Sequence, residues 1–404
     1  MSRPPDVQVV LRGLGAVLLL AGGVSTAAPQ AAPSPSGSRN GCVERFDASR
    51  DYFEGKASIE AAEGFSVEYR KSYKVVTVKT AYPGGPPESY VLLQCGAPLP
   101  SLPAELASAP VVRVPIRSMF SASTTHLPLL VDLGRVDVLT GVSNAAWIMS
   151  PPVRERIRSG KVTEFGARAT IDVESVVARH PDVFMSGGDQ SPAYAALRAA
   201  GVPVVANVEW LETTPMGRAE WVKYLALFLN EEVKAQALFE SVRARYEAYA
   251  ARVRPIPDAE RPRVMTGNVV QGQFAIAGGR SFMARLIRDA GGRYVWSDNP
   301  DTGGPLIDLE SQLRRAADAD IWINGGVWKD RAAMLSEEPR YAEFKAYRNG
   351  QVWVYMRKAT PAGANDYWSR GVTRPDLVLA DLIKILHPAS MKDHEFEWYI
   401  QVPR

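Results

Sequence analysis

The stretch IDVESVVARHPDVFMSGG, from Ile171 to Gly188, decides the fold because the chain repeats it as IDLESQLRRAADADIWINGG, from Ile307 to Gly326. Both copies begin with Ile-Asp-aliphatic-Glu-Ser and continue through about two turns of helical pattern to an Asp. Each then enters a short apolar run that stops at Gly-Gly, an order typical of one unit of a parallel α/β sheet. Two such copies predict two similar lobes, with the ligand site in the cleft between them.

Length and composition limit the class of protein. The chain has 404 residues, 46% of them hydrophobic, which is enough to build two hydrophobic cores. The formal net charge of +3 is small and the sequence has no dense basic cluster, so no nucleic-acid partner is expected.

The N-terminus has the pattern of an export signal. Arg3 and Arg12 precede an apolar stretch at 13–24, and small residues follow it as a cleavage site. The stretch is too short to span a bilayer core of about 30 Å. We therefore expect a signal peptide over residues 1–27, cleaved near Ala27, and a flexible Pro/Ser/Ala-rich leader over residues 28–41.

The cysteines bear on the compartment. Gly23 stands where a lipidated cysteine would follow the apolar stretch, which favours a soluble periplasmic protein over a lipoprotein. The only two cysteines, Cys42 and Cys95, are most simply joined as a disulfide in an oxidising compartment. On the loop-entropy model such a bond stabilises the fold by about 3–4 kcal/mol.

The first third of the chain indicates strands. Alternating or apolar runs at Phe65–Lys79 and Tyr90–Gln94, with a Pro/Gly-rich loop between them, predict a β extension over residues 42–109 that packs on the first lobe. The first lobe is expected over residues 110–229. Its sheet is predicted to begin with Val111–Ile116, followed by a loop from Arg117 to Thr125 and a strand at Val136–Leu139.

The middle of the chain predicts helices. Pro215 suits a first helical position after Thr214. Asn230 is expected to cap a second helix that runs to about Val253. This linking helix, over residues 230–254, would be roughly 35 Å long, enough to join two lobes. A second lobe is expected over residues 255–390 and a tail over residues 391–404.

In these features the chain resembles the helix-linked (class III) periplasmic substrate-binding proteins of ABC importers, which receive iron-siderophores, haem or cobalamin. The resemblance covers about Val111 to Pro388 and is carried by the Leu133-Gly134 and Gly141-Val142-Ser143 turns, Glu174 with Pro181-Asp182, Ser281-Phe282, Asp289-Ala290-Gly291-Gly292, Glu310 and Asn349-Gly350-Gln351-Val352. A closer subgroup shares the runs Gly217–Trp221 and Asn365–Trp368. The resemblance implies two Rossmann-like α/β lobes with parallel sheets joined by one long α-helix, to which this chain adds its N-terminal β extension.

The resemblance also implies two contacts with a membrane permease. In the family, one acidic residue on each lobe docks into the permease, and the matching positions are Glu174 and Glu310, each at the same place in its repeat. The alternative is that each Glu only stabilises the first turn of its helix through the helix dipole, by about 0.3–1 kcal/mol.

Candidate ligand contacts follow the strands, because ligands of doubly wound sheets bind beyond the carboxyl ends of the strands. Aromatic residues at several strand exits suit a flat macrocycle or a catecholate, and an arginine suits an anionic chelate. The expected ligand-binding residues are Arg117, Ser118, Phe120, Trp147, Gln190, Trp210, Phe274, Trp296, Trp328, Arg357, Asn365, Tyr367 and Trp368.

A bare metal ion is not the expected ligand. The chain has four histidines, and only His126 is expected near the cleft, whereas a bare zinc or manganese site needs three or four convergent ligands. We therefore expect no catalytic residues, no protein-held metal and no cofactor. The expected ligand is a chelated metal, with a ferric siderophore favoured and cobalamin or haem as the alternative.

Two other classes of protein are less favoured. One is an enzyme of the metal-chelatase kind on the same fold, but the sequence has no HExxH, GxSxG or phosphate-loop motif. The other is a structural or adhesion module. The favoured interpretation of the sequence is a monomeric binding protein that delivers its ligand to the permease and ATPase of an ABC importer.

Overall fold

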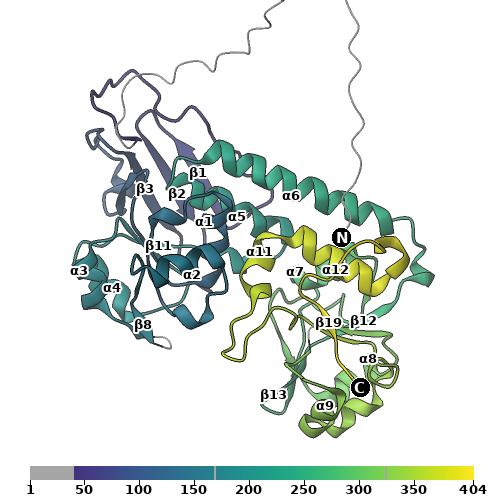
Figure 1. The fold of residues 1–404 in the computed structure, drawn as a ribbon. Coiled ribbons are helices and arrows are strands. Elements are labelled where there is room, and N and C mark those ends of the chain that lie inside the picture. Colours follow the sequence, from purple (N-terminus) through teal and green to yellow (C-terminus); the bar gives the residue numbers. More distant parts are fainter. Residues whose placement is uncertain (1–40, 168–169, 324) are drawn as a thin grey trace, which may run out of the picture. The chain divides into compact units, whose positions relative to one another are not determined.

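The computed structural model describes residues 41–167, 170–323 and 325–404 (Figure 1). The expected signal peptide and the leader up to residue 40 lie outside the described residues. None of the described helices is both long enough and apolar enough to cross a membrane.

The first lobe is built on a parallel sheet. Its strand order is β11-β10-β5-β6-β7, and every neighbouring pair is parallel. The strands are β5 (Met119–Ser121), β6 (Leu139–Val142), β7 (Thr163–Glu164), β10 (Val183–Ser186) and β11 (Val204–Ala206). The helices of this lobe are α1 (Leu127–Asp132), α2 (Pro151–Arg158), α3 (Val173–Arg179), α4 (Pro192–Ala199) and α5 (Pro215–Leu227). Pro215 occupies the first helical position of α5 after the Thr214 cap, as predicted.

The second lobe repeats this plan with a mixed edge. Its strand order is β15-β12-β17-β18-β19, in which only β19 is antiparallel to its neighbour. The strands are β12 (Arg263–Thr266), β15 (Arg293–Tyr294), β17 (Ile321–Ile323), β18 (Val352–Val354) and β19 (Ile400–Gln401), and a small antiparallel sheet adds β13 (Asn268–Val270), β14 (Gln273–Ala275) and β16 (Leu306–Ile307). The helices are α7 (Phe282–Asp289), α8 (Leu309–Ala316), α9 (Arg331–Glu337), α10 (Lys345–Arg348), α11 (Arg370–Thr373) and α12 (Pro375–Leu386).

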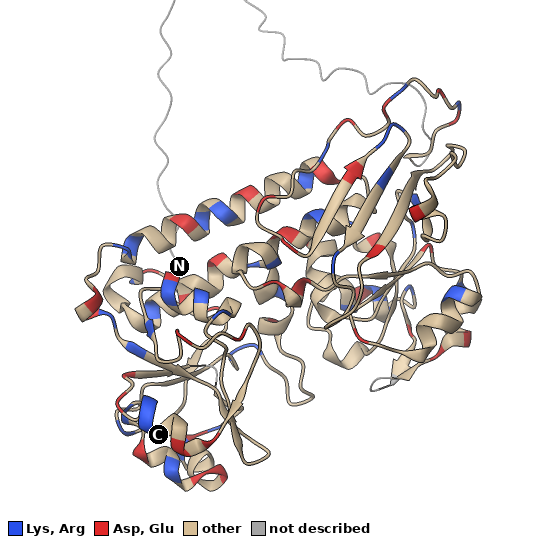
Figure 2. Ribbon diagram, turned by 180° about the vertical axis from the view of Figure 1, so that it is seen from behind, with Lys and Arg blue, Asp and Glu red and all other residues tan. Residues whose placement is uncertain are grey.

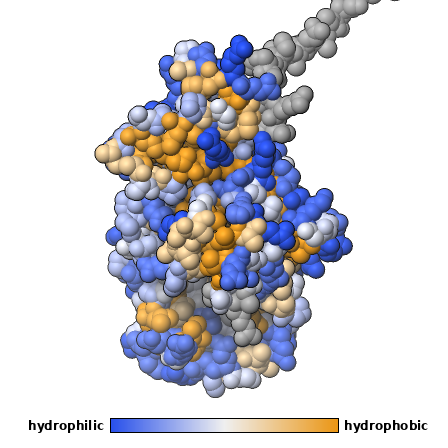
Figure 3. Space-filling model, turned by 90° about the vertical axis from the view of Figure 1, so that its left-hand side faces the viewer, coloured by the Kyte–Doolittle hydropathy of each residue, from blue (hydrophilic) through white to orange (hydrophobic). Residues whose placement is uncertain are grey.

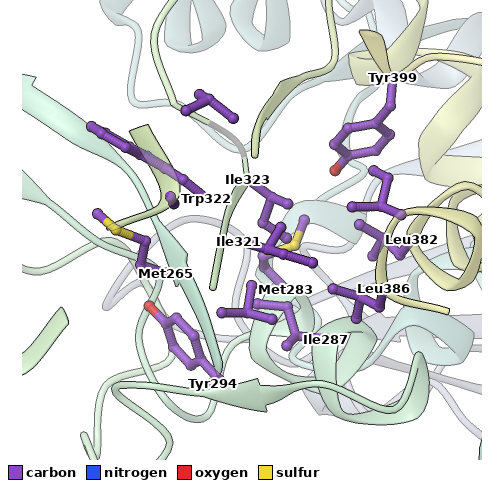
Figure 4. Close-up of a cluster of buried hydrophobic side chains, with 14 of the residues drawn as sticks. Met265, Met283, Ile287, Tyr294, Ile321, Trp322, Ile323, Leu382, Leu386 and Tyr399 are labelled. Carbon is purple, nitrogen blue, oxygen red and sulfur yellow. The ribbon is translucent and has the colours of Figure 1, made fainter. Parts of the chain in front are cut away.

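The core of the second lobe lies between its sheet and the helices α7 and α12. Ile321 and Ile323 of β17 lie beside Met283 and Ile287 of α7 and beside Leu382 and Leu386 of α12 (Figure 4). These side chains are buried, which explains why β17 is apolar throughout: a parallel strand covered on both faces has no polar face.

The sequence repeat corresponds to one structural unit in each lobe. Asp172 caps α3 by accepting a hydrogen bond from the Ser175 N–H at 3.0 Å, and Asp308 caps α8 by accepting one from the Ser311 N–H at 2.7 Å. Each helix is followed by a parallel strand, β10 or β17. The repeat therefore predicted the two-lobed α/β architecture correctly.

One long helix links the lobes, as predicted. Helix α6 (Glu232–Val253) has 22 residues and packs against both α5 and α12, and basic and acidic residues mix along it (Figure 2). Asn230 does not cap it, contrary to expectation. Its backbone is left-handed at φ 55°, and its side-chain oxygen accepts a hydrogen bond from the buried Lys74 Nζ at 2.8 Å instead.

Lys74 lies in a buried polar cluster at the N-terminal end of α6. Its ammonium group also donates to the Leu227 carbonyl at 2.6 Å and to Glu232 Oε1 at 2.5 Å. Burial lowers the pKa of Lys74 to about 8, although the Glu232 carboxylate opposes this shift. This ion pair ties the N-terminal sheet to the linking helix.

The N-terminal extension is a four-stranded sheet in the order β1-β2-β3-β4. Its strands are β1 (Phe65–Tyr69), β2 (Tyr73–Val78), β3 (Glu88–Gln94) and β4 (Val111–Val114). The disulfide between Cys42 and Cys95 is present, which confirms that prediction. Some apolar side chains of this extension remain at the surface, among them the half-exposed Leu99. Figure 3 shows a hydrophobic patch, coloured orange, in the upper part of the molecule.

Two predicted strands of the first lobe are corrected. The run at Val111–Ile116 forms β4, which pairs with β3 of the extension, and the lobe sheet begins with β5 inside the segment expected as a loop. The segment Val136–Val138 is a short 3₁₀ turn, and the strand follows it as β6. Apolar runs this short show that a segment is buried, but they do not show which sheet it joins.

Two carboxylates of the α5 region hold the segment that leads into the extension. Glu220 is fully buried and accepts hydrogen bonds from the backbone N–H groups of residues 60, 61 and 62 at 2.6–3.0 Å. Glu212 accepts hydrogen bonds from the N–H groups of residues 63 and 64. A Cβ atom at Gly217 would lie 2.8 Å from Glu212 Oε2, which explains the glycine that opens the Gly217–Trp221 run.

We expect Glu220→Gln to lower the free energy of unfolding by about 3–5 kcal/mol, because it removes the charge that pairs with the buried Lys223 ammonium 2.6 Å away. The amide would also set a donor against backbone donors. Urea denaturation measures the effect. The matched variant Glu105→Gln, at an exposed position, should change stability by less than about 0.5 kcal/mol. Equal effects of the two variants would contradict the stabilising role of the buried Glu220 carboxylate.

Candidate functional site

A cavity of about 420 Å³ lies where the two lobes meet. The first lobe contributes the loop after β5, helix α1, and the segment from Trp147 to the start of α2. The second lobe contributes the segment that follows β18 and the start of α11. The lining residues are Thr124, Leu127, Pro128, Val131, Asp132, Trp147, Ile148, Met149, Ser150, Pro151, Pro152, Lys358, Asp366, Ser369 and Arg370.

The wall from the first lobe is mainly apolar. Trp147 ends a 3₁₀ turn that Asn144 caps by accepting a hydrogen bond from the Ala146 N–H at 2.9 Å. The indole is 51% exposed although it lines the cavity, so it can contact a ligand. An exposed aromatic ring beside aliphatic and proline side chains suits a ligand with an apolar or planar face.

The charged groups of the cavity come mainly from the second lobe. Lys358 and Arg370 both donate to the carboxylate of Glu397. Burial raises the pKa of Glu397, but these two hydrogen bonds outweigh it and the pKa is lowered overall. Across the cavity, burial raises the pKa of Asp132. The positive charges of Arg374 and Arg370 oppose this rise. The second lobe thus presents two cations that share the Glu397 carboxylate, and Asp366 adds a further carboxylate to the lining.

The Asn365–Trp368 run forms a rigid aromatic corner beside this cavity. Asn365 accepts a hydrogen bond from the Tyr367 N–H at 3.0 Å and donates one to the Tyr355 carbonyl at 3.1 Å. Tyr367 is buried and stacks on Tyr355 with ring centroids 4.4 Å apart. Trp368 is 44% exposed and, with Tyr367, lines a second cavity of only about 20 Å³.

A buried polar cluster lies next to that corner. His126 is fully buried, with Nδ1 3.0 Å from Ser121 Oγ and Nε2 3.3 Å from the Asn207 carbonyl, so Nε2 carries the proton. Its Nε2 also lies 4.0 Å from Glu209 Oε2. Burial raises the pKa of Glu209, and the nearby Arg218 charge opposes the rise. The Arg218 guanidinium in turn lies 4.3 Å from the ring centre of Phe282 in the second lobe.

Several aromatic residues expected in the cleft belong to hydrophobic cores instead. Phe120 packs on Phe165 in the first lobe, and Phe274 packs among Trp322, Tyr341 and Phe344 in the second. Trp328 is buried against Trp322 and donates to Glu337. Trp296 is half-buried, donates to Gln312 and lies below Arg315. Sequence cannot tell an inward-facing aromatic at a strand exit from an outward-facing one.

Arg117 and Ser118 lie at the wrong end of the first sheet. Both precede β5, and their backbone N–H groups donate to Asp182, which precedes β10. They therefore lie at the amino ends of the strands, away from the expected cleft. The error follows from the strand assigned to Val111–Ile116.

The remaining candidates lie near strand exits but not at the inter-lobe cavity. Gln190 is exposed and lines a different cavity beside the N-terminal extension. Trp210 is 44% exposed, with its indole N–H bonded to the Gly187 carbonyl. Arg357 is exposed, and its backbone N–H donates to the Trp398 carbonyl. Glu174 and Glu310 are exposed as expected, and Glu310 accepts a hydrogen bond from Arg340 at 2.6 Å.

Sequence reasoning missed the polar groups around the cavity. Asp132, Lys358 and Arg370 line it, and Glu209 is buried near it, although none of them belongs to a motif. A usable signal was their position, since Lys358 and Arg370 flank the Asn365–Trp368 run and Glu209 precedes Trp210. Within the described parts of the chain, no group of three or more His, Cys, Asp or Glu residues could hold a metal ion.

Comparison with known proteins identifies the family. Residues 120–359, more than half of the chain, match the family model described as periplasmic binding protein. The chain therefore belongs to the periplasmic binding protein family.

Its curated relatives include two uncharacterized lipoproteins of Methanocaldococcus jannaschii. One is 26% identical over 300 residues, covering 72% of this chain and 70% of the relative. The other is 25% identical over 326 residues, covering 78% of this chain and 80% of the relative.

Solved structures share the fold. A possible iron-binding periplasmic solute-binding protein from Staphylococcus epidermidis superimposes with a TM-score of 0.54 at 18% identity, covering 67% of this chain and 98% of that one. The periplasmic haem-binding protein HutB of Vibrio cholerae superimposes with a TM-score of 0.51 at 20% identity. The match covers 65% of this chain and 98% of HutB. This likeness agrees with the two-lobed α/β architecture predicted from the repeat.

His126 should make stability depend on pH. Burial lowers its pKa from 6.5 to about 4, so between these values the unfolded chain binds the proton and the folded chain does not. The free energy of unfolding should therefore fall by about 3 kcal/mol through this residue as the pH drops from 6.5 to 4. Denaturation at several pH values should show a smaller fall in His126→Gln than in the native chain. Parallel pH profiles would contradict the prediction.

Proposed function

We propose that this protein is an exported substrate-binding protein that captures a chelated metal in the inter-lobe cavity and delivers it to an ABC importer. A ferric siderophore is the proposed ligand, and cobalamin or haem is the alternative within the same family. The observation that carries the proposal is the cavity itself, which joins an apolar wall with Trp147 on one lobe to Lys358 and Arg370 on the other.

The cavity lining supports a ligand with two kinds of surface. Trp147 and its aliphatic neighbours suit the organic face of a chelator, and the cations of the second lobe suit its anionic groups. Lys358 and Arg370 share the carboxylate of Glu397, and the carboxylates of Asp132 and Asp366 also line the cavity, so the cations stand beside acidic groups and can pair with an anionic group of a ligand only in competition with them. In this respect they take the place that the sequence assigned to Arg117 and Arg357.

The site of delivery is proposed from the symmetry of the repeat. Glu174 and Glu310 each occupy the second position of a helix that an Asp caps, one helix in each lobe. Both side chains are exposed, so a permease with basic pockets can reach them. We propose that the protein acts as a monomer in this complex. We also propose that it is released as a soluble protein rather than held as a lipoprotein.

Fluorescence titration tests the ligand class. The mature protein is titrated with ferric hydroxamates, catecholates and carboxylates, with cobalamin, haem and free Zn²⁺, and Trp147 emission should be quenched by a ferric chelate. Trp147→Ala should weaken binding about 5–30-fold, since an aromatic contact contributes roughly 1–2 kcal/mol. Trp210→Ala removes an indole of similar exposure (44% against 51% for Trp147) outside the cavity and is the matched control.

The pattern of binding separates the alternatives. Binding of cobalamin or haem with no ferric chelate would select the second ligand class. Tight binding of Zn²⁺ alone would refute the chelate proposal. Equal losses in Trp147→Ala and Trp210→Ala would refute the inter-lobe cavity as the site.

Charge reversal tests docking. The double variant Glu174→Lys/Glu310→Lys should abolish ligand uptake by cells that carry the importer, while ligand affinity in solution stays within about two-fold of the native value. The control pair Glu105→Lys/Glu395→Lys changes the net charge by the same amount at other exposed positions. Normal uptake in the first pair would show that these residues serve only their helix ends.

A further inference from the structure

A second large cavity lies beside α7 of the second lobe, and Thr213 and Thr214, which precede α5, also line it. Its volume is about 690 Å³, and it shares no lining residue with the inter-lobe cavity. The lining residues are Thr213, Thr214, Asp258, Arg261, Gly279, Arg280, Ser281, Ala284, Arg285, Arg288, Gly292, Arg293, Tyr294 and Ser297. We call it the arginine groove.

The charge of the groove is unbalanced. Five arginines line it, and Asp258 is the single carboxylate among its lining residues. An adjoining cavity of about 380 Å³ shares Arg261, Arg285 and Arg288 with the groove and adds Arg254, together with Glu247 and Asp289. Several basic segments gather in this part of the second lobe, beyond the end of α6, on the left of Figure 2.

The ion pairs of the groove leave part of this charge uncompensated. Arg261 lies 3.3 Å from Asp258, and Arg285 and Arg288 lie 2.9 Å and 3.6 Å from Asp289. Arg280 is exposed, and its guanidinium forms no hydrogen bond or ion pair with the described residues. Arg293 is also exposed, and among the described residues its side chain donates only to the Arg261 carbonyl, at 2.9 Å.

Five arginines that line one groove repel one another, and Arg280 and Arg293 have no carboxylate partner among the described residues to offset the repulsion. Arg293 is bonded to the backbone of Arg261, so these two residues are kept together rather than free to spread into solvent. A bound oxyanion would remove the repulsion. Phosphate oxygens suit the guanidinium group because they accept two parallel N–H hydrogen bonds from it.

We propose that the arginine groove binds a phosphate-bearing anion. Its concave shape favours a discrete anionic group over a flat charged surface. The phosphate can come from a small soluble compound or from the headgroup of an anionic lipid. The groove is separate from the cavity proposed for the chelate, so both can be occupied at once.

Isothermal titration calorimetry with inorganic pyrophosphate at low salt tests the first source, with the mature protein free of chelate. Co-sedimentation with phosphatidylglycerol vesicles, compared with phosphatidylcholine vesicles, tests the second. Binding should weaken steeply as salt is added, because the contacts are ionic. A response to pyrophosphate alone assigns a soluble ligand, and a response to the anionic vesicles alone assigns a lipid. No response to either overturns the proposal.

Matched arginine variants test the location. Arg280→Ala/Arg293→Ala should lower affinity at least about ten-fold, since each removes a charge-assisted contact. Arg154→Ala/Arg179→Ala removes two exposed arginines of the first lobe and should leave affinity unchanged. Equal losses in the two pairs would overturn the assignment. If the first double variant folds poorly, Arg280→Ala alone serves, because that side chain has no partner among the described residues to lose.

Discussion

Buried carboxylates that accept hydrogen bonds from backbone N–H groups hold the separate parts of this fold together. Glu220 and Glu212 hold the segment before the N-terminal sheet, and Asp381 on α12 does the same for residues 397–399. A carboxylate buried in this way is stable only while its donors stay in place, because an unpaired buried charge is very costly. Each of these carboxylates therefore ties the stability of its own element to that of the remote segment that it binds.

Helix α5 also connects this constraint to the inter-lobe cavity. Helix α5 holds the N-terminal segment through Glu220, and through Arg218 it contacts Phe282 of the second lobe and lies near Glu209. The same helix packs against α6 and α11, and α11 begins with Arg370 of the cavity. Most residues of α5 are buried, polar ones included, since neighbouring elements cover it on several sides.

The sequence was most informative where a pattern repeats or a residue has one simple partner. The duplicated Asp-aliphatic-Glu-Ser unit predicted two parallel α/β lobes, and the two cysteines predicted their bond. It was least informative where the direction of a side chain decides the outcome. Phe274 and Trp328 follow the same kind of pattern as Trp147, yet the first two pack into a core and only Trp147 faces the cavity. The arginines of the groove lie between residues 261 and 293 but form no continuous basic run, so the sequence alone does not show that they line one groove.

The short strand β19 has a consequence for behaviour at high concentration. A parallel sheet that ended at β18 would leave a row of unpaired N–H and C=O groups open to any other extended chain. The antiparallel pairing of Trp353 with Gln401 and of Val354 with Ile400 covers that row. Asp381 fixes the approach to β19, with His394 bonded to the same carboxylate at 2.6 Å. Strand β19 then forms the edge itself, and because it has only two residues it offers little backbone for edge-to-edge pairing. None of residues 394–401 lines the inter-lobe cavity.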